Sequence, residues 1–449
     1  MNFPLALVAQ ALPKLFPPFD LLTFAQDLRK YGDVAYYKLG PLRVYQLNSP
    51  ILARQILVEQ SEKFYKPRFI KRAFDPFAGS GLFTSDGELW KRQRKLMQPA
   101  FQHHQLGSYG EIMVSHALRA TDSFRDGEVR EISAEMTKLT LGVVVKSLFG
   151  ADFTRQSEEI GELMMAVLEA TNRRLAQAVQ IPAWVPTRRN LREKRALTRL
   201  EAMLRGIIQE RRKSGEERTD LLTVLLKAVD EESGSGMSDK QLRDEMMTLF
   251  LAGHETTANA LTWTWYLLSQ NQSVEAKLHE ELRKVLQGRP PVAADLPQLP
   301  YLEMVIRESM RLYPPAPGFA REPLEDVNIG GYLVPKGSLI AVNTFALHRD
   351  SRFFPDPERF DPERFAEGWE ERIPRYAYLP FGAGPRVCIG NGFAMMEARL
   401  IAATIAQRWQ LSLEPGQKVV PLQVVTVRPK DGLRMRLTSR VTSGASARV

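Results

Sequence analysis

The arrangement of apolar and polar residues changes along the 449-residue chain. From about Asp75 to Arg311 the apolar residues recur at the spacing of helices. Short runs rich in Val, Ile and Tyr, bounded by turn residues, lie near 34–47, 327–343 and 419–437. This pattern predicts a mainly α protein with a smaller β lobe, to which strands from both ends of the chain contribute.

The longest predicted helix begins after Ser238 and ends near Ser269. Gln241 follows Ser238 at the spacing of a capping box. The middle of the helix is apolar and contains Ala-Gly-His-Glu-Thr-Thr at 252–257. Because a threonine hydroxyl can compete for carbonyls one turn back, we expect weakened backbone hydrogen bonds there. A zinc-protease motif, His-Glu-x-x-His, is excluded because Ala258 stands where the second histidine is required.

Cys388 is the only cysteine, and it lies in Phe-Gly-Ala-Gly-Pro-Arg-Val-Cys-Ile-Gly at 381–390. One cysteine excludes a disulfide framework. A single thiolate also cannot hold a structural zinc ion or an iron–sulfur cluster, which need several protein ligands. A metal bound here must therefore come already chelated, and haem meets that requirement. The alternative is a buried cysteine that acts as a small apolar residue.

The pattern Phe-x-x-Gly-x-Arg-x-Cys-x-Gly, followed by a helical run from Phe393, resembles the haem-binding loop of the cytochrome P450 family. The resemblance implies the cytochrome P450 fold, with a long central helix across the haem and the cysteine loop on its proximal side. It implies haem b (iron protoporphyrin IX) as the cofactor and Cys388 as the iron ligand. Phe381, Arg386 and Gly390 are implied to contact the haem.

Further motifs occur in the order found in that family. The segment at 252–257 resembles the family's oxygen-binding helix, which implies that Glu255 and Thr256 form a proton relay. Trp90 and Arg94, four residues apart, share one helix face and are implied to bind a haem propionate, as is Arg321. For Arg94 taken alone, the alternative is a solvated basic helix.

Glu308 and Arg311 are three residues apart on a predicted helix and can therefore pair on one face. An exposed pair of this kind would contribute ~0.5 kcal/mol or less. The resemblance instead implies a buried pair, closed by the arginine of a Pro-Glu-Arg-Phe element. That element occurs twice, around Arg359 and Arg364, and the spacing to the cysteine favours Arg364.

Alignment of the motifs predicts a mostly apolar substrate pocket, which favours a fatty acid, terpenoid or carotenoid over a sugar or peptide. The predicted lining residues are Phe74, Phe77, Leu82, Phe250, Leu251, Ala252, Ala316, Pro317, Phe319, Val424 and Val425. The predicted function is that of a haem-thiolate monooxygenase, which inserts one oxygen atom of O2 into such a substrate with electrons from a separate redox partner.

Two alternative functions remain open at this point. A peroxygenase would use hydrogen peroxide and need no reductase, but such enzymes depart from the acid–alcohol pair that Glu255 and Thr256 retain. A haem-thiolate gas sensor would keep Cys388 without using a proton relay, and it would need an output module that the sequence does not reveal.

The formal net charge is +9, which bears on the kind of partner. Nucleic-acid binding would require clustered basic residues with interleaved aromatics, whereas these charges are mixed with nearly as many acids. An acidic electron donor, a ferredoxin or flavodoxin with its reductase, is favoured instead. Lys91, Arg92 and Lys95, on the helix that carries Trp90, are the expected docking residues.

A single cytochrome P450 domain is predicted over 1–449. We expect a β-rich lobe from about 30–75, 320–345 and 415–440, and a helical lobe from about 76–311 and 391–410. No apolar run reaches the ~20 residues that cross a bilayer. We therefore expect a monomeric cytoplasmic protein of the bacterial type, with peripheral membrane contact through Phe3–Leu15 or Ile181–Val185 left open.

Overall fold

The computed structural model describes most of the chain and divides it into two compact units. The described residues are 20–151, 157–176, 181–216, 218, 220–229, 234 and 236–440. The first unit comprises 1–68, 303–388 and 420–430, and the second comprises 69–302, 389–419 and 431–449. The apolar segment Phe3–Leu15 lies outside the described residues.

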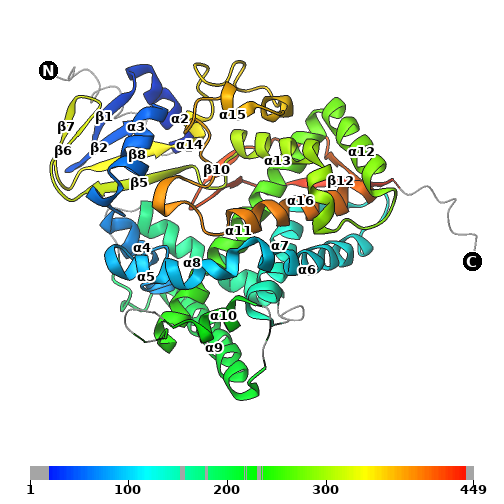
Figure 1. Ribbon diagram of the computed structural model, residues 1–449, viewed down its shortest axis with the longest axis horizontal. Helices are drawn as coiled ribbons and strands as arrows, with labels where there is room; N and C mark the ends of the chain where they lie inside the picture. The colour runs from blue at the N-terminus through cyan, green and yellow to red at the C-terminus, as the bar shows by residue number, and fades with distance from the viewer. Residues whose placement is uncertain are drawn as a thin grey trace, which may run out of the picture. The chain divides into compact units, whose positions relative to one another are not determined.

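The first unit is built on a mixed five-stranded sheet in the order β1-β2-β8-β5-β3 (Figure 1). The strands are β1 Val34–Leu39, β2 Leu42–Leu47, β3 Phe64–Tyr65, β5 Gly318–Pro323 and β8 Leu339–Asn343. β2 and β8 run parallel and the other neighbours run antiparallel. Leu47, Ile340 and Val342 are buried in one cluster on this sheet, so strands from distant parts of the sequence share one apolar core.

Short elements complete the first unit. The hairpins are β6 Val327–Ile329 with β7 Tyr332–Val334, and β10 Pro421–Gln423 with β11 Val427–Pro429. The helices are α2 Leu21–Asp27, α3 Pro50–Arg54, α13 Pro300–Leu312, α14 Thr344–Leu347 and α15 Trp369–Arg372, of which α13 begins in the second unit. The predicted contribution of both chain ends to the strands is confirmed.

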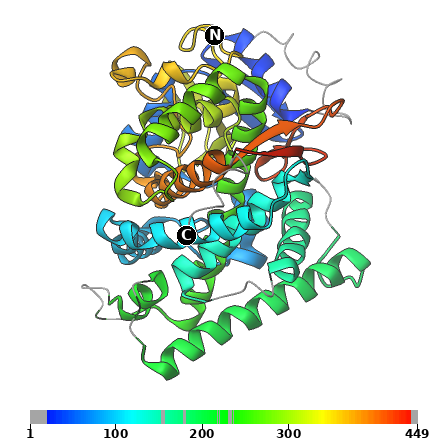
Figure 2. The ribbon, with the colours of Figure 1, turned by 90° about the vertical axis from the view of Figure 1, so that its right-hand side faces the viewer.

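The second unit is mainly helical, and Figure 2 shows its long helix α9 in green. Its helices are α4 Arg68–Ala78, α5 Gly87–Met97, α6 His103–Asp122, α7 Ile132–Phe149, α8 Ser157–Ala176, α9 Arg188–Ser214, α10 Leu221–Lys227, α11 Asp239–Gln270, α12 Gln272–Leu286 and α16 Asn391–Arg408. A small sheet joins β4 Val129–Glu131, β12 Arg434–Ser439 and β9 Trp409–Leu413. Among the described residues, no helix is both long and apolar enough to cross a bilayer.

Helix α11 is the long helix that the sequence predicts. Its capping box is confirmed, because Gln241 N–H donates to Ser238 Oγ while Ser238 N–H donates to Gln241 Oε1. Helix α7 packs along it so closely that a Cβ on Gly253 would lie 2.9 Å from Val144 Cγ2. Thr140 Oγ1 also donates to the carbonyl of His254 at 2.9 Å. These contacts hold the 252–257 segment in a fixed place on α7.

Candidate functional site

The Cys388 loop is a tight backbone structure in the first unit. Gly382 and Gly384 have φ angles of +75° and +68°, which L side chains rarely adopt. A Cβ on Gly384 would also lie 2.0 Å from the carbonyl oxygen of Leu57, so glycine is required there on two grounds. Cys388 N–H donates to the carbonyl of Phe381 at 2.9 Å. The loop therefore presents its sulfur from a constrained backbone.

The Cys388 side chain is exposed and forms no disulfide. A structural cysteine is normally among the most buried residues of a protein. The alternative of a buried cysteine that acts as a small apolar residue is therefore wrong. An accessible sulfur on a constrained loop is what ligation of a chelated metal requires.

Helix α11 carries a short accessible window within a buried helix. Residues 244–251 and 257–265 are buried, whereas Ala252 is exposed and Gly253, Glu255 and Thr256 are partly exposed. Thr256 Oγ1 donates to the carbonyl of Ala252 at 2.7 Å, so the hydroxyl does engage a carbonyl one turn back. The helix nevertheless continues unbroken through this segment. The window thus presents a carboxyl and a hydroxyl beside small residues, which leave room for a bound molecule.

His254 lies within this window segment but points the other way. It is 2% exposed, and its Nδ1 lies 2.6 Å from the carbonyl oxygen of Phe250. Burial lowers the pKa of His254 to about 4, so the imidazole is neutral near pH 7. The His254 imidazole therefore stays neutral at the near-neutral pH at which Glu255 and Thr256 would deliver protons.

The predicted pocket residues fall in both units. Phe250 is buried in a stack with Phe149, their ring centroids 6.4 Å apart, so it packs toward α7 and outside the exposed window. Phe74 lies against Phe83 at 4.9 Å. Among the others, Phe77, Leu82, Leu251 and Pro317 are buried, Ala252 is exposed, and Ala316, Phe319, Val424 and Val425 are half-buried. All of these side chains are apolar, as expected for a pocket that takes a hydrophobic compound.

Two adjacent acids of α11 hold the loop that follows α4. Asp244 Oδ2 accepts from Ser80 N–H at 3.0 Å, and Glu245 Oε2 accepts from Leu82 N–H at 2.9 Å. A Cβ on Gly81 would lie 2.2 Å from Thr248 Oγ1, which shows how closely this loop approaches the helix. Burial raises the pKa of Glu245 to about 8, although the Leu82 amide opposes that effect. Sequence reasoning missed both acids, but two carboxyls in an apolar stretch of helix are a signal that it could have used.

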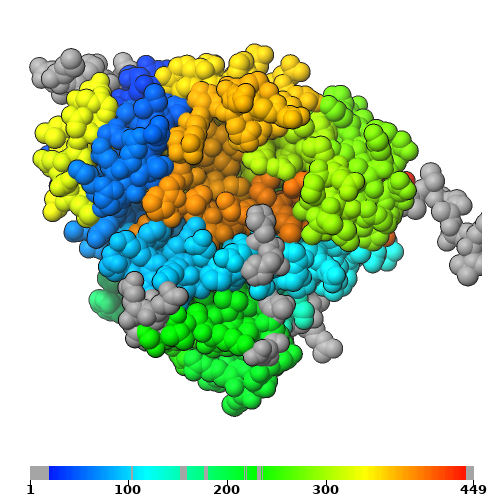
Figure 3. All heavy atoms as spheres, in the orientation of Figure 1, coloured from blue at the N-terminus to red at the C-terminus, as the bar shows by residue number. Residues whose placement is uncertain are grey.

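Helix α5 carries one of the predicted cofactor pairs and two of the expected docking residues. Trp90 and Arg94 are both half-buried and one turn apart. Lys91 and Lys95 are exposed, and the light-blue atoms of this part of the chain lie at the surface in Figure 3. Arg92 differs from the expectation of an outward docking residue, because it is half-buried and donates to the carbonyl of Gly236 at 3.2 Å.

The remaining predicted haem contacts lie on β5 and in the cysteine loop. Arg321 is half-buried on β5 and donates to the carbonyl of Ala320 at 2.9 Å. Arg386 is half-buried at the end of the turn Gly384–Arg386. Gly390 has an ordinary negative φ and caps α16, where its carbonyl accepts from Ala394 N–H at 2.8 Å. Gly390 is thus a helix cap. Its backbone angle does not require glycine, so its small size is what would let the haem approach closely.

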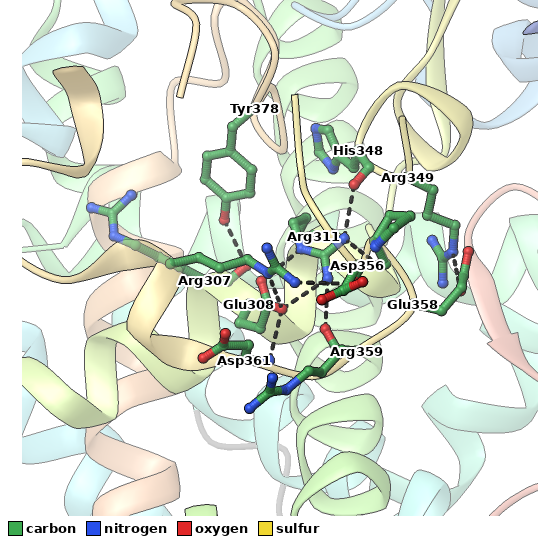
Figure 4. A network of polar contacts seen from close by, with 12 residues as sticks. Arg307, Glu308, Arg311, His348, Arg349, Asp356, Glu358, Arg359, Asp361 and Tyr378 are labelled. Carbon is green, nitrogen blue, oxygen red and sulfur yellow. Dashed lines mark hydrogen bonds and ion pairs between the residues drawn. The ribbon is translucent and has the colours of Figure 1, made fainter. Parts of the chain in front are cut away.

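Glu308 and Arg311 form a pair that is 0% exposed on both sides (Figure 4). The two carboxylate oxygens accept from Arg311 Nε at 2.6 Å and from Nη2 at 2.8 Å, which is a bidentate arrangement. Arg364 Nε lies 3.3 Å from Glu308 Oε1. Arg359, the competing candidate, contributes only its carbonyl, which accepts from Arg311 Nη2 at 3.1 Å. Arg364 is therefore the third charged member of the cluster.

Comparison with known proteins agrees with this arrangement. Residues 22–434 match the family model described as cytochrome P450. Cyclooctatin synthase of Streptomyces melanosporofaciens is 38% identical over 89% of this chain and 87% of its own length. Pentalenene oxygenase of Streptomyces avermitilis is 35% identical over 93% of each chain.

A solved structure, the crystal structure of cytochrome P450DA heme domain, superposes with a TM-score of 0.86 at 27% identity, over 94% of this chain and 93% of the other. The mainly α fold with small sheets is the fold of that haem domain. Sequence, fold and the exposed cysteine agree, and this chain belongs to the cytochrome P450 family of haem-thiolate monooxygenases.

Proposed function

We propose that this protein hydroxylates a terpenoid, with Cys388 as the ligand of haem b and Glu255 and Thr256 as its proton-delivering residues. The observation that carries the proposal is the accessible thiol on a constrained loop, in a chain related to a cyclooctatin synthase and a pentalenene oxygenase. A fatty acid or carotenoid is the alternative within the same class of hydrophobic compounds.

The residues present fit a haem with two carboxylate arms. One accessible thiol suits a metal whose other ligands come from a porphyrin. Arg94, Arg321 and Arg386 offer guanidinium groups, and Trp90 offers an indole N–H, to the propionates. When bound, a thiolate-ligated haem supplies the activation of O2.

The α11 window supports the role of Glu255 and Thr256. The Thr256 hydroxyl donates to Ala252 at rest and can turn toward a bound molecule beside Ala252 and Gly253. Glu255 is partly exposed, so its carboxyl can exchange protons with water and pass them to that hydroxyl. The pair thereby delivers protons to the oxygen site while the buried helix on either side excludes bulk water.

A redox partner must supply the electrons, and we propose an acidic ferredoxin or flavodoxin that docks on Lys91 and Lys95. Both lysines are exposed on α5 and can steer an acidic protein toward that helix. We further propose that the protein acts as a monomer in the cytoplasm. Peripheral membrane contact would use Ile181 and Trp184, which are 63% and 83% exposed.

The test begins with the absorption spectrum of the reduced protein under carbon monoxide. The strongly red-shifted band of a thiolate-ligated haem is expected in the wild type and should be lost in Cys388→His, because imidazole is a weaker electron donor. Retention of that band in the variant would remove Cys388 from the ligand role.

Turnover then identifies the reaction. Product from terpene hydrocarbons with O2, NADPH and a ferredoxin system is expected, with little from hydrogen peroxide alone. Equal product from peroxide without reductase would make the protein a peroxygenase. Carbon monoxide binding with no turnover of terpenoids, fatty acids or carotenoids would favour the gas sensor.

A further inference from the structure

His348 joins the buried ion-pair cluster to the start of the cysteine loop. It is 0% exposed and follows α14, and its amide donates to the carbonyl of Thr344 at 2.8 Å. Its own carbonyl accepts from Arg311 Nη1 at 2.9 Å (Figure 4). Its ring Nε2 accepts from the backbone N–H of Leu379 at 2.8 Å. One residue therefore contacts the cluster through its backbone and the loop through its side chain.

The hydrogen bond from Leu379 determines the form of the imidazole. A nitrogen that accepts from an amide carries no proton, so in the neutral ring the proton is on Nδ1. Burial, reinforced by the charges of Arg311 and Arg349, lowers the pKa of His348 to about 3. The ring is consequently neutral near pH 7 and remains an acceptor there.

Aromatic side chains hold the ring in the orientation that this hydrogen bond needs. The ring of Tyr378 lies 5.1 Å from the imidazole at an interplanar angle of 35°, and the ring of Phe354 lies at 6.4 Å. Tyr378 is itself fixed, because its hydroxyl donates to the carbonyl of Arg307 at 2.9 Å. The acceptor nitrogen is thus pre-oriented toward Leu379.

The contact continues through the loop to the cysteine. Gly382 N–H donates to the carbonyl of Leu379 at 3.2 Å, and Cys388 N–H donates to the carbonyl of Phe381 at 2.9 Å. A short series of hydrogen bonds therefore runs from Arg311 by way of His348 to the backbone that carries the sulfur. Apolar packing alone would not specify the direction of the Leu379 amide.

We propose that His348 is a positioning residue for the cysteine loop, which it holds by accepting the Leu379 amide while the Glu308–Arg311 cluster holds His348. The proposal rests on the proposed role of Cys388 as the haem ligand. Without the acceptor at His348, the Leu379 amide would have no partner on that side and the loop would open more often. The sulfur would then be held less firmly at the iron.

The test compares His348→Leu, which keeps much of the volume and removes the acceptor, with His348→Gln, whose Oε1 can accept the same amide. In the haem-loaded protein, the Leu379 amide should exchange with solvent at least about tenfold faster in His348→Leu, as expected for a lost buried hydrogen bond. The thiolate band of the reduced carbon monoxide complex should decay faster in the same variant. His348→Gln should restore both properties.

Gln46→Leu is the matched control, because it removes a buried side-chain hydrogen bond elsewhere in the first unit, from Gln46 Nε2 to the carbonyl of Ala25 at 2.8 Å, without touching the Leu379 contact. It should leave exchange at Leu379 near the wild-type rate. Wild-type exchange and band lifetime in His348→Leu would overturn the proposal. So would a Gln variant as impaired as the Leu variant, since the loss would then reflect packing.

A measurement on the wild type keeps the proposal testable if His348→Leu does not fold. Nitrogen-15 spectra of the histidine-labelled carbon monoxide complex should show His348 protonated at Nδ1 only, without titration between about pH 5 and 8. A proton on Nε2 would exclude the Leu379 hydrogen bond. Absence of the thiolate band in the wild type would instead refute the ligand role of Cys388, which separates the two failures.

Discussion

The Glu245 carboxyl should make the stability of this protein fall as the pH rises toward 8. Burial raises the pKa of Glu245 to about 8 in the folded chain, against 4.5 for an ordinary glutamate. Between these two values the folded state keeps the proton, whereas the unfolded state has released it. Because the folded state binds more protons at this group, the stability that Glu245 contributes is greatest below about pH 4.5 and is lost progressively up to about pH 8.

The size of the effect follows from the same two values. Each pH unit between them changes the free energy of unfolding by ~1.4 kcal/mol, so the whole interval is worth on the order of 5 kcal/mol. Folded proteins are typically stable by only about 5–15 kcal/mol, so this one side chain should change the pH profile measurably, while His254 and His348, whose pKa values burial lowers from 6.5 to about 4 and about 3, act in the opposite direction below about pH 6.5. Glu245→Gln keeps an acceptor for Leu82 and cannot ionise, so it should be similar to the wild type at low pH and more stable near pH 8.

Denaturant unfolding of the haem-loaded protein at intervals between pH 5 and 9 measures this directly. The stability of the wild type relative to Glu245→Gln should fall steadily as the pH rises through this range. Asp239→Asn is the matched control, because Asp239 belongs to the same helix but its side chain is 71% exposed, and it should keep the wild-type slope. Parallel pH profiles for the wild type and Glu245→Gln would refute the reasoning.

Three further outcomes are expected. Thr256→Ala should keep haem and substrate binding but convert reductant to hydrogen peroxide, with product formation reduced by ~10²-fold or more; product and reductant counted together check this, and wild-type coupling would contradict it. Arg311→Ala and Glu308→Ala should yield little haem-loaded protein, because removal of one partner leaves the other charge buried at a cost of roughly 3–5 kcal/mol; normal haem content and melting in both would count against it. Charge reversal of Lys91 and Lys95 to Glu should slow reduction by ferredoxin, most clearly at low salt, and stopped-flow rates indifferent to both charge and salt would mean that the donor docks elsewhere.

The sequence predicted those features that depend on short spacing. The capping box at Ser238 and the pairing of Glu308 with Arg311 both involve residues three positions apart, so a helical pattern is enough to bring them together. The choice of Arg364 over Arg359 rested on its spacing to the cysteine, and the structure explains it, because Arg364 directs its side chain at Glu308 whereas Arg359 contributes its carbonyl.

Features that depend on tertiary contact were not visible in the sequence. Glu245 meets Leu82, and His348 meets Leu379, across segments far apart in the chain. Neither residue belongs to a recognisable motif. Phe250 shows a related difficulty. Successive residues of a helix point in different directions, so Phe250, Leu251 and Ala252 cannot all line the predicted substrate pocket.

The close approach of Val144 to Gly253 has a consequence for how this enzyme can change. Gly253 has no side chain, and the branched side chain of Val144 occupies the space that a side chain at 253 would need. Neither position is therefore free to vary alone. Gly253→Ala by itself should push α7 away from the segment that carries Thr256, while Val144→Ala by itself should leave a void. The double substitution adds one methyl group at 253 and removes two at 144, so the new side chain finds room. Engineering aimed at the reactive turn of α11 would therefore do best to treat these two positions as one unit.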